Sequence, residues 1–191
     1  EMRANHHKEF MQALFRQCGD LMLTITRMPQ PVIARVHGIA TAAGCQLVSM
    51  CDLAVAADVA KFAVSGINVG LFCSTPAVGL ARNLGRKNAL EMLLTGEFID
   101  AMEARAKGLV NRVVPADALD AEVERLAQAI LAKSAVAVRM GKGMFYRQLE
   151  MGLGEAYDYA AEVMACNMMS EDAGEGIDAF MEKRPPNYRG C

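Results

Sequence analysis

The chain has 191 residues, of which 53% are apolar, and it carries 20 basic against 22 acidic side chains. This length suits one domain or most of one, and the abundance of small, flexible apolar side chains is typical of a soluble α/β or α-rich protein. The nearly balanced charge gives no basis for a nucleic-acid or anionic-membrane partner. No apolar run approaches the length of a membrane span.

The cysteines of the chain indicate a reducing compartment. The six cysteines form no Cys-x-x-Cys pair, so we interpret them as reduced structural thiols and expect neither a disulfide framework nor a metal site. His6 and His7 are adjacent but have no third ligand nearby in the sequence, which favours an exposed helix end. The chain begins at Glu1 without an initiator methionine, and we expect a piece of a longer protein whose targeting segment cannot be read here.

Apolar spacing along the first two thirds predicts alternating helices and strands. Residues 6–26 show helical spacing, which Pro29 and Pro31 end. We expect strands at 32–36, 52–57, 61–63 and 109–114, with 61–63 at a sheet edge. The mostly apolar run 32–36 suits a parallel sheet that is covered on both faces. Further helices are expected at 45–50, 75–84, 87–94 and 100–107. Gly96 is expected to close the helix at 87–94, and Asp100 with Glu103 forms a capping box at the start of the helix at 100–107.

Beyond Pro115 the sequence predicts only helices, at about 117–132, 135–149, 153–169 and 173–182. The last is expected to begin at Asp172, with Glu175 completing a capping box. This shift in composition predicts two parts, a sheet-containing core at 1–115 and a helical region at 116–191. The Met-rich run 163–169 favours a packing or subunit interface over a cofactor site.

The run of very small residues at 40–44 is the strongest candidate for a functional site. Small residues ahead of a helix let a ligand approach the first-turn N–H groups, which carry the positive end of the helix dipole. A carbonyl oxygen held there would be polarised. The alternative is that small side chains only permit close packing of the helix on a strand. No Asp or Glu lies between Asp58 and Glu91, so the site lacks a local carboxylate to move protons.

Three separated motifs resemble the crotonase, or enoyl-CoA hydratase/isomerase, family. They are Gly-Ile-Ala-Thr-Ala-Ala-Gly-Cys-Gln-Leu at 38–47 with Cys-Asp at 51–52, Thr-Gly-Glu-Phe-Ile-Asp-Ala-Met-Glu-Ala at 95–104 with Gly-Leu-Val-Asn-Arg-Val-Val-Pro at 108–115, and Glu-Gly-Ile-Asp-Ala-Phe-Met-Glu-Lys-Arg at 175–184. The resemblance covers the chain in order. Segments 40–46 and 70–76 are most similar to the branch of the family called enoyl-CoA hydratase domain-containing protein 3.

This resemblance implies an α/β fold: a crotonase-like ββα spiral core whose N-terminal part is missing, followed by an α-helical trimerisation region. It implies an acyl-CoA ligand, a homotrimer or hexamer, and a lyase or isomerase of fatty-acid metabolism. Coenzyme A enters as part of the substrate, and no separate cofactor or metal is expected. One oxyanion N–H is carried over to Ala43, and the other falls in a segment before Glu1. Further substrate-binding positions are Ala42, Gly44, Ser65, Phe72, Cys73, Ser74, Phe180 and Lys183.

The sequence departs from the family at both catalytic glutamates. Gln46 stands at the first position and cannot accept a proton, and Gly66 stands at the second. Because a positioned acid or base is worth about 10²–10⁴ in rate, ordinary hydratase activity is not expected. Either another group moves the proton (Ser65, Ser74, ordered water or the absent segment), or the protein binds acyl-CoA without catalysis, or it is a purely structural subunit. We expect the cytoplasm for a bacterial source and the mitochondrial matrix for a eukaryotic one.

Overall fold

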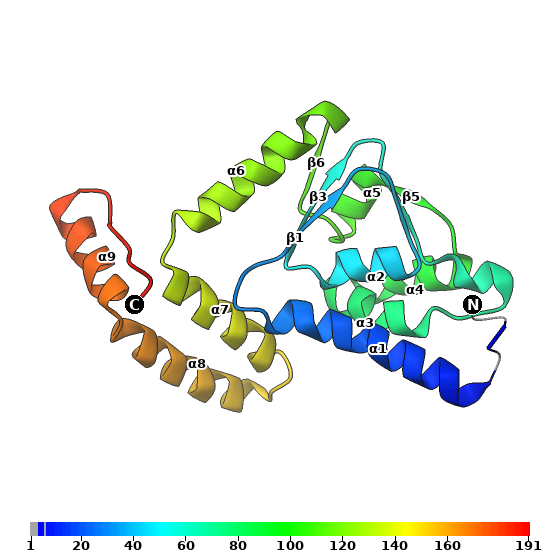
Figure 1. The fold of residues 1–191 in the computed structure, drawn as a ribbon, viewed down its shortest axis with the longest axis horizontal. Coiled ribbons are helices and arrows are strands. Elements are labelled where there is room, and N and C mark those ends of the chain that lie inside the picture. Colours follow the sequence, from blue (N-terminus) through cyan, green and yellow to red (C-terminus); the bar gives the residue numbers. More distant parts are fainter. Residues whose placement is uncertain (1–3, 6) are drawn as a thin grey trace. The chain divides into compact units, whose positions relative to one another are not determined.

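The computed structural model describes residues 4–5 and 7–191, and its elements follow the chain as Figure 1 shows. The chain divides into two compact units. The first unit comprises residues 1–25 and 32–123, and the second comprises residues 26–31 and 124–191.

A parallel sheet forms one part of the first unit. Its strand order is β1-β3-β6, where β1 is Ile33–Val36, β3 is Leu53–Ala57 and β6 is Arg112–Val114. β1 pairs with β3 and β3 pairs with β6, both in parallel. The parallel pairing predicted for the first strand is therefore confirmed. β3 is buried along most of its length, as a central parallel strand requires.

A second small sheet has the order β2-β4-β5, where β2 is Ile39–Thr41, β4 is Lys61–Ala63 and β5 is Ile99–Asp100. β4 pairs in parallel with β2 and antiparallel with β5. The prediction that 61–63 lies at a sheet edge was wrong. Residues 39–41, which the predicted strands do not include, form the extra strand β2 and pair in parallel with β4.

Helices of the first unit follow the predicted segments closely. Among them are α1 (Lys8–Arg27, ending in the second unit), α2 (Ala43–Met50), α3 (Ser74–Asn83), α4 (Arg86–Thr95) and α5 (Ala101–Ala106), with the 3₁₀ helix η1 at Ser65–Val69. Asp100 caps α5 by accepting from the Glu103 amide at 2.8 Å, as predicted. Gly96 ends α4 with φ 65°, a conformation that glycine adopts without steric cost.

The core of the first unit lies between its sheets and the helices α2–α5. Its largest fully buried side chains include Phe62, Leu80 and Met92, and Cys45 is completely buried among them. Small residues fill much of the remaining interior, since Ala56, Ala60, Ala101 and Ala104 are all fully buried. This packing holds α2 against β2 and α3 and so fixes the backbone turn at 42–44.

The second unit is built from helices. After η2 (Ala116–Ala118), which lies in the first unit, α6 (Leu119–Leu131) leads into α7 (Ala135–Gln148), α8 (Leu153–Met168) and α9 (Glu171–Glu182). α7 and α8 pack against each other as a hairpin (Figure 1). In the described part of the chain, no helix is both long and apolar enough to cross a membrane.

Ser170, and not Asp172, caps α9, since its side chain accepts from the Ala173 amide at 3.2 Å. Asp172 is buried and accepts instead from the Ser134 hydroxyl at 2.6 Å and from the amides of Arg189 and Gly190. The predicted capping box was therefore wrong. Asp172 fastens the C-terminal segment 184–191 to the start of α9.

Candidate functional site

The turn that leads into α2 has an unusual backbone. Ala42 adopts φ 48° and ψ −116°, a region that residues with a Cβ rarely occupy. Its amide donates to the Ala63 carbonyl at 3.0 Å, and its carbonyl accepts from the Gln46 amide at 3.0 Å. These bonds hold the turn between the end of β4 and the first turn of α2. Strain of this kind costs on the order of 1–3 kcal/mol and is concentrated at functional sites.

The first turn of α2 is open to a ligand. Ala43 and Gly44 are exposed, whereas the next residue, Cys45, is fully buried. First-turn N–H groups have no partner within their own helix and carry the positive end of the helix dipole. The geometry therefore suits the binding of a carbonyl oxygen at Ala43 N–H, the role that the family resemblance implies for this residue.

Gln46 is only 4% exposed, and its Oε1 accepts from the Cys18 thiol at 3.5 Å. Cys18 comes from α1, 28 positions earlier, and nothing in the sequence singled it out as a neighbour of Gln46. The amide is neutral and can donate and accept hydrogen bonds, but it cannot take up a proton as a base.

Ser65 and Gly66 lie beside this turn, because β2 and β4 run in parallel and end together. The hydroxyl oxygens of Thr41 and Ser65 are 3.2 Å apart. Gly66 has no room for a side chain, since a Cβ placed there would lie 2.7 Å from both Cys73 Sγ and the Leu71 carbonyl oxygen. No acid or base can therefore stand at position 66 without displacement of this loop.

The loop that follows η1 supplies the other predicted site residues of the first unit. Phe72 is 45% exposed, and Cys73 is half-buried against the core. Ser74 begins α3, and its hydroxyl donates to the Phe72 carbonyl at 3.3 Å. Burial raises the pKa of the Cys45 thiol to about 12, with a smaller contribution from Cys73. Cys45 is thus an inert core thiol.

Phe180 and Lys183, the two remaining predicted site residues, belong to the second unit. Phe180 is 81% exposed near the end of α9. Lys183 ends the helix in the left-handed region at φ 57°. The bidentate pair between the guanidinium of Arg184 and the Glu175 carboxylate, at 2.6 and 2.9 Å, holds the backbone directly after Lys183.

A hollow of about 410 Å³ lies in the first unit and includes Gly44 in its lining. It is lined mainly by apolar residues of 32–51, together with Ile25. His37 follows β1 directly, is exposed and borders this hollow.

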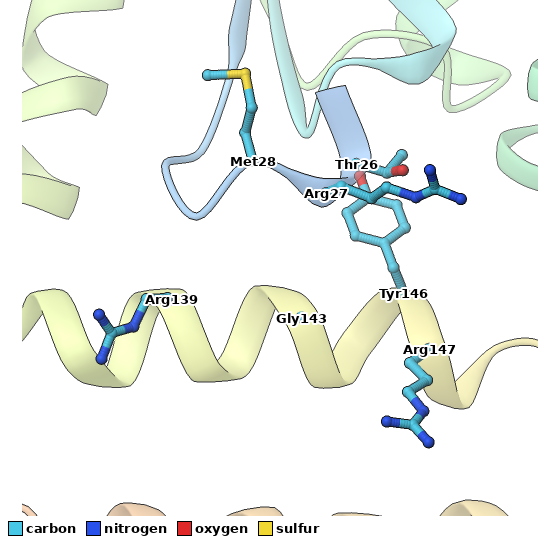
Figure 2. Close-up of a pocket in the computed structure, with 7 residues that line it drawn as sticks. All are labelled: Thr26, Arg27, Met28, Arg139, Gly143, Tyr146 and Arg147. Atoms are coloured by element: carbon cyan, nitrogen blue, oxygen red, sulfur yellow. The ribbon is translucent and has the colours of Figure 1, made fainter. Parts of the chain in front are cut away.

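A second hollow, of about 370 Å³, lies within the second unit and is bordered by Arg27, Arg139 and Arg147. Figure 2 shows these three side chains pointing in different directions, with the Tyr146 ring extending toward Thr26 and Arg27. The Arg147 guanidinium carbon lies 4.6 Å from the ring centroid of Tyr159, a cation–π distance. The guanidinium groups do not converge as an anion site would require. No cluster of three metal-ligating side chains occurs among the residues described.

Three features together define the crotonase class of protein. They are an α/β core with two small sheets, a strained turn of small residues that leads into α2, and a helical C-terminal unit. Residues 1–190 match the model of the enoyl-CoA hydratase/isomerase family, and the chain belongs to this family.

Relatives at high identity agree with this assignment. The mitochondrial enoyl-CoA hydratase domain-containing protein 3 of Rattus norvegicus is 47% identical over 97% of this chain and 62% of its own length. The protein of the same name from Homo sapiens is 48% identical, over 97% and 61% respectively. The branch that the sequence resembles is thereby confirmed. The chain spans a little over three fifths of these relatives.

Solved structures agree as well. The crystal structure of an enoyl-CoA hydratase of Mycobacterium smegmatis is similar with a TM-score of 0.94 and 61% identity, covering 95% of this chain and 71% of that one. The crystal structure of human enoyl Coenzyme A hydratase domain-containing protein 3 gives a TM-score of 0.91 and 49% identity, with coverages of 94% and 71%. The predicted crotonase-type α/β fold with a helical C-terminal region is confirmed.

Proposed function

We propose that this chain is the thioester-holding part of an acyl-CoA-binding member of the enoyl-CoA hydratase/isomerase family. The acyl carbonyl oxygen is held at Ala43 N–H, on the open first turn of α2. The observation that carries the proposal is the strained Ala42 backbone, which is tied to Ala63 and turns the exposed first-turn amides outward.

Around this oxygen, the neighbouring loops would hold the rest of the ligand. The residues proposed for this role all belong to the first unit. They are Ala42 and Gly44 in the turn itself, Ser65 after β4, Phe72 and Cys73 in the loop that leads into α3, and Ser74 at the start of α3. Phe180 and Lys183 are exposed at the end of α9 and would meet the adenine and phosphate end of a coenzyme A bound to a neighbouring subunit. We further propose a homotrimer or hexamer that assembles through the helical region.

The proposed protein does not carry out ordinary hydration. Gln46 cannot act as a base, and position 66 has no space for an acid. Both facts favour a non-catalytic acyl-CoA-binding or regulatory role in fatty-acid metabolism over a hydratase or isomerase. Since the names of the relatives describe them as mitochondrial, we propose the mitochondrial matrix if the source is a eukaryote, and the cytoplasm if it is a bacterium.

A matched pair of ligands tests the proposed contact. Butyryl-CoA and S-butyl-CoA differ only in the thioester carbonyl oxygen, and their affinities for the full-length protein can be measured by calorimetric titration. We expect saturable binding of both and at least about fivefold tighter binding of butyryl-CoA, because each hydrogen bond to the oxygen contributes on the order of 1 kcal/mol. Absence of any binding would support the purely structural subunit, and equal affinities would overturn the oxygen-holding turn.

A further inference from the structure

The side-chain amide of Gln46 uses its two ends differently. Its Oε1 accepts from the Cys18 thiol at 3.5 Å, and this is the bond recorded for the amide. Across the described residues, no buried side-chain nitrogen or oxygen lacks a hydrogen-bond partner. The amide Nε2 is therefore not sealed in the interior, although Gln46 as a whole is only 4% exposed. The N–H groups of Gln46 Nε2 are therefore available to donate to a ligand.

Helix geometry shows toward which part of α2 this amide leans. Side chains of an α-helix lean toward its N-terminus, and residues three apart share a face. Gln46 stands three positions after Ala43 in α2, so its amide leans over the first turn. That turn is where Ala43 and Gly44 are exposed. Helix geometry therefore places the Gln46 side chain on the same helix face as Ala43.

We propose that Gln46 is a ligand-binding residue, whose Nε2 donates a hydrogen bond to the acyl thioester oxygen held at Ala43 N–H. This inference rests on the proposed function and adds a second donor to it. Side-chain amides can serve in oxyanion sites together with backbone N–H groups. Gln46 then has a role of its own at the position where a glutamate is expected, and that role requires no proton transfer.

Cys18 is the positioning residue for this donor. A thiol donates weakly through S–H, and a side-chain amide accepts through its carbonyl oxygen while its NH2 group donates. The Cys18 contact therefore holds Oε1 toward α1 and turns Nε2 toward the first turn of α2. Replacement by serine keeps a hydroxyl donor at this place, whereas replacement by alanine removes it.

The test uses the ratio of butyryl-CoA to S-butyl-CoA affinity in variants of the full-length protein. Gln46→Met retains the shape of the side chain and removes its hydrogen bonds, and we expect the ratio to fall about fivefold relative to the wild type. Gln128→Met is the matched control, since Gln128 is an exposed helical glutamine of the second unit that bonds Glu124. It should retain the wild-type ratio.

Cys18 variants provide the second measurement. Cys18→Ala should lower the ratio by about two- to threefold, and Cys18→Ser should restore it, because a hydroxyl can again donate to Oε1. A role limited to packing predicts instead that neither variant changes the ratio, and that outcome would overturn the positioning role of Cys18. Because each ratio is taken within one variant, a general loss of folded protein lowers both affinities and leaves the ratio unchanged.

The outcomes separate this inference from the proposed function. A wild-type preference for butyryl-CoA that Gln46→Met leaves intact would overturn the Gln46 donor while Ala43 remains the holding group. A wild-type protein that binds neither ligand, or binds both equally, would overturn the proposed function and the inference together. A reduced ratio in Gln46→Met, with restoration in Cys18→Ser, supports both.

Discussion

The Ala42 amide donates to the Ala63 carbonyl at 3.0 Å, and this single bond connects the turn before α2 to the strand that leads into Ser65 and Gly66. This bond continues the parallel pairing of β2 with β4, in which Thr41 lies opposite Ala63, by one residue beyond the end of β2. The positive φ of Ala42 follows from this connection, because the chain must leave the strand and enter the helix within one residue. The candidate site is therefore a product of sheet pairing.

Replacement of Ala42 by glycine should stabilise the protein. Relief of strain on the order of 1–3 kcal/mol exceeds the entropic cost of glycine, roughly 0.5–1 kcal/mol, so we expect a net gain of about 1 kcal/mol in the free energy of unfolding. The matched control is Ala43→Gly, which lies within the helix and should lose about 0.5–1 kcal/mol. Urea denaturation of both variants measures the difference. Destabilisation of equal size in both would contradict the strained backbone.

A methyl group at position 66 should be poorly tolerated. In Gly66→Ala the new Cβ would meet both Cys73 Sγ and the Leu71 carbonyl oxygen at 2.7 Å, and overpacking of this kind costs about 1–3 kcal/mol. The double variant with Cys73→Ala should recover only part of the loss, because the backbone contact remains.

Gly19→Ala is the control for this experiment. Nothing lies within 4 Å of a Cβ at Gly19, and alanine is favoured over glycine inside a helix by roughly 1 kcal/mol. The control should therefore raise the thermal midpoint, while Gly66→Ala lowers it. If Gly66→Ala were neutral, the absence of a proton donor at this position would lose its steric explanation.

Acid should release the C-terminal segment. Hydrogen bonds from the Arg184 guanidinium, and then from the Asn187 amide, lower the pKa of Glu175 from 4.5 to about 2, and the Ser134 hydroxyl and the amides of Arg189 and Gly190 lower the pKa of Asp172. A folded-state pKa below the unfolded value means that the stabilisation is complete above about pH 4.5. It is lost as pH falls toward 2.

Thermal unfolding between pH 7 and pH 2 measures this effect. Glu175→Gln should unfold at a lower temperature than the wild type at pH 7, and the two midpoints should converge as pH approaches 2. Glu162→Gln removes one carboxylate from α8 outside the 184–191 contacts and controls for net charge. A constant gap between the wild type and Glu175→Gln at every pH would show that the carboxylate charge is not the source of the stabilisation.

The cysteines should react with iodoacetamide in a fixed order at pH 8. Cys166 is exposed and should react first. Cys191 is exposed too, but the hydrogen bond to Glu171 raises the pKa of its thiol, so less thiolate is present and the reaction is slower. Cys45 is buried with a pKa of about 12 and should react only after unfolding. Peptide mass spectrometry follows each site, and early labelling of Cys45 would contradict the packing of α2 on the core.

Local sequence signals predicted much of the fold. The Asp100 cap, the Gly96 stop and the apolar run that becomes β1 each act over a few residues, and the structure confirms them. β2 and η1 were missed, because residues 39–41 and 65–69 carry no clear apolar period. The sequence pattern predicts an α9 cap at Asp172, whereas Ser170 is the cap because Asp172 is engaged in a tertiary contact with Ser134.

The candidate site was predicted in part. Ala42, Ala43 and Gly44 are recognisable from their small size ahead of a helix, and Ser65 and Gly66 are brought beside them by parallel pairing. The contact of Cys18 with Gln46 joins residues 28 positions apart and depends on how α1 packs, which no local pattern encodes. The lack of space for a side chain at Gly66 likewise depends on the loop that contains Leu71 and Cys73, and no local pattern encodes the position of this loop.

Turnover of crotonyl-CoA by the full-length protein tests the central claim most directly, with loss of the conjugated enoyl thioester absorbance as the signal. The account predicts no hydration above the uncatalysed background in a sample that binds butyryl-CoA saturably. Hydration at the rate of an ordinary hydratase would contradict it, because a competent acid and base would then exist despite Gln46 and Gly66.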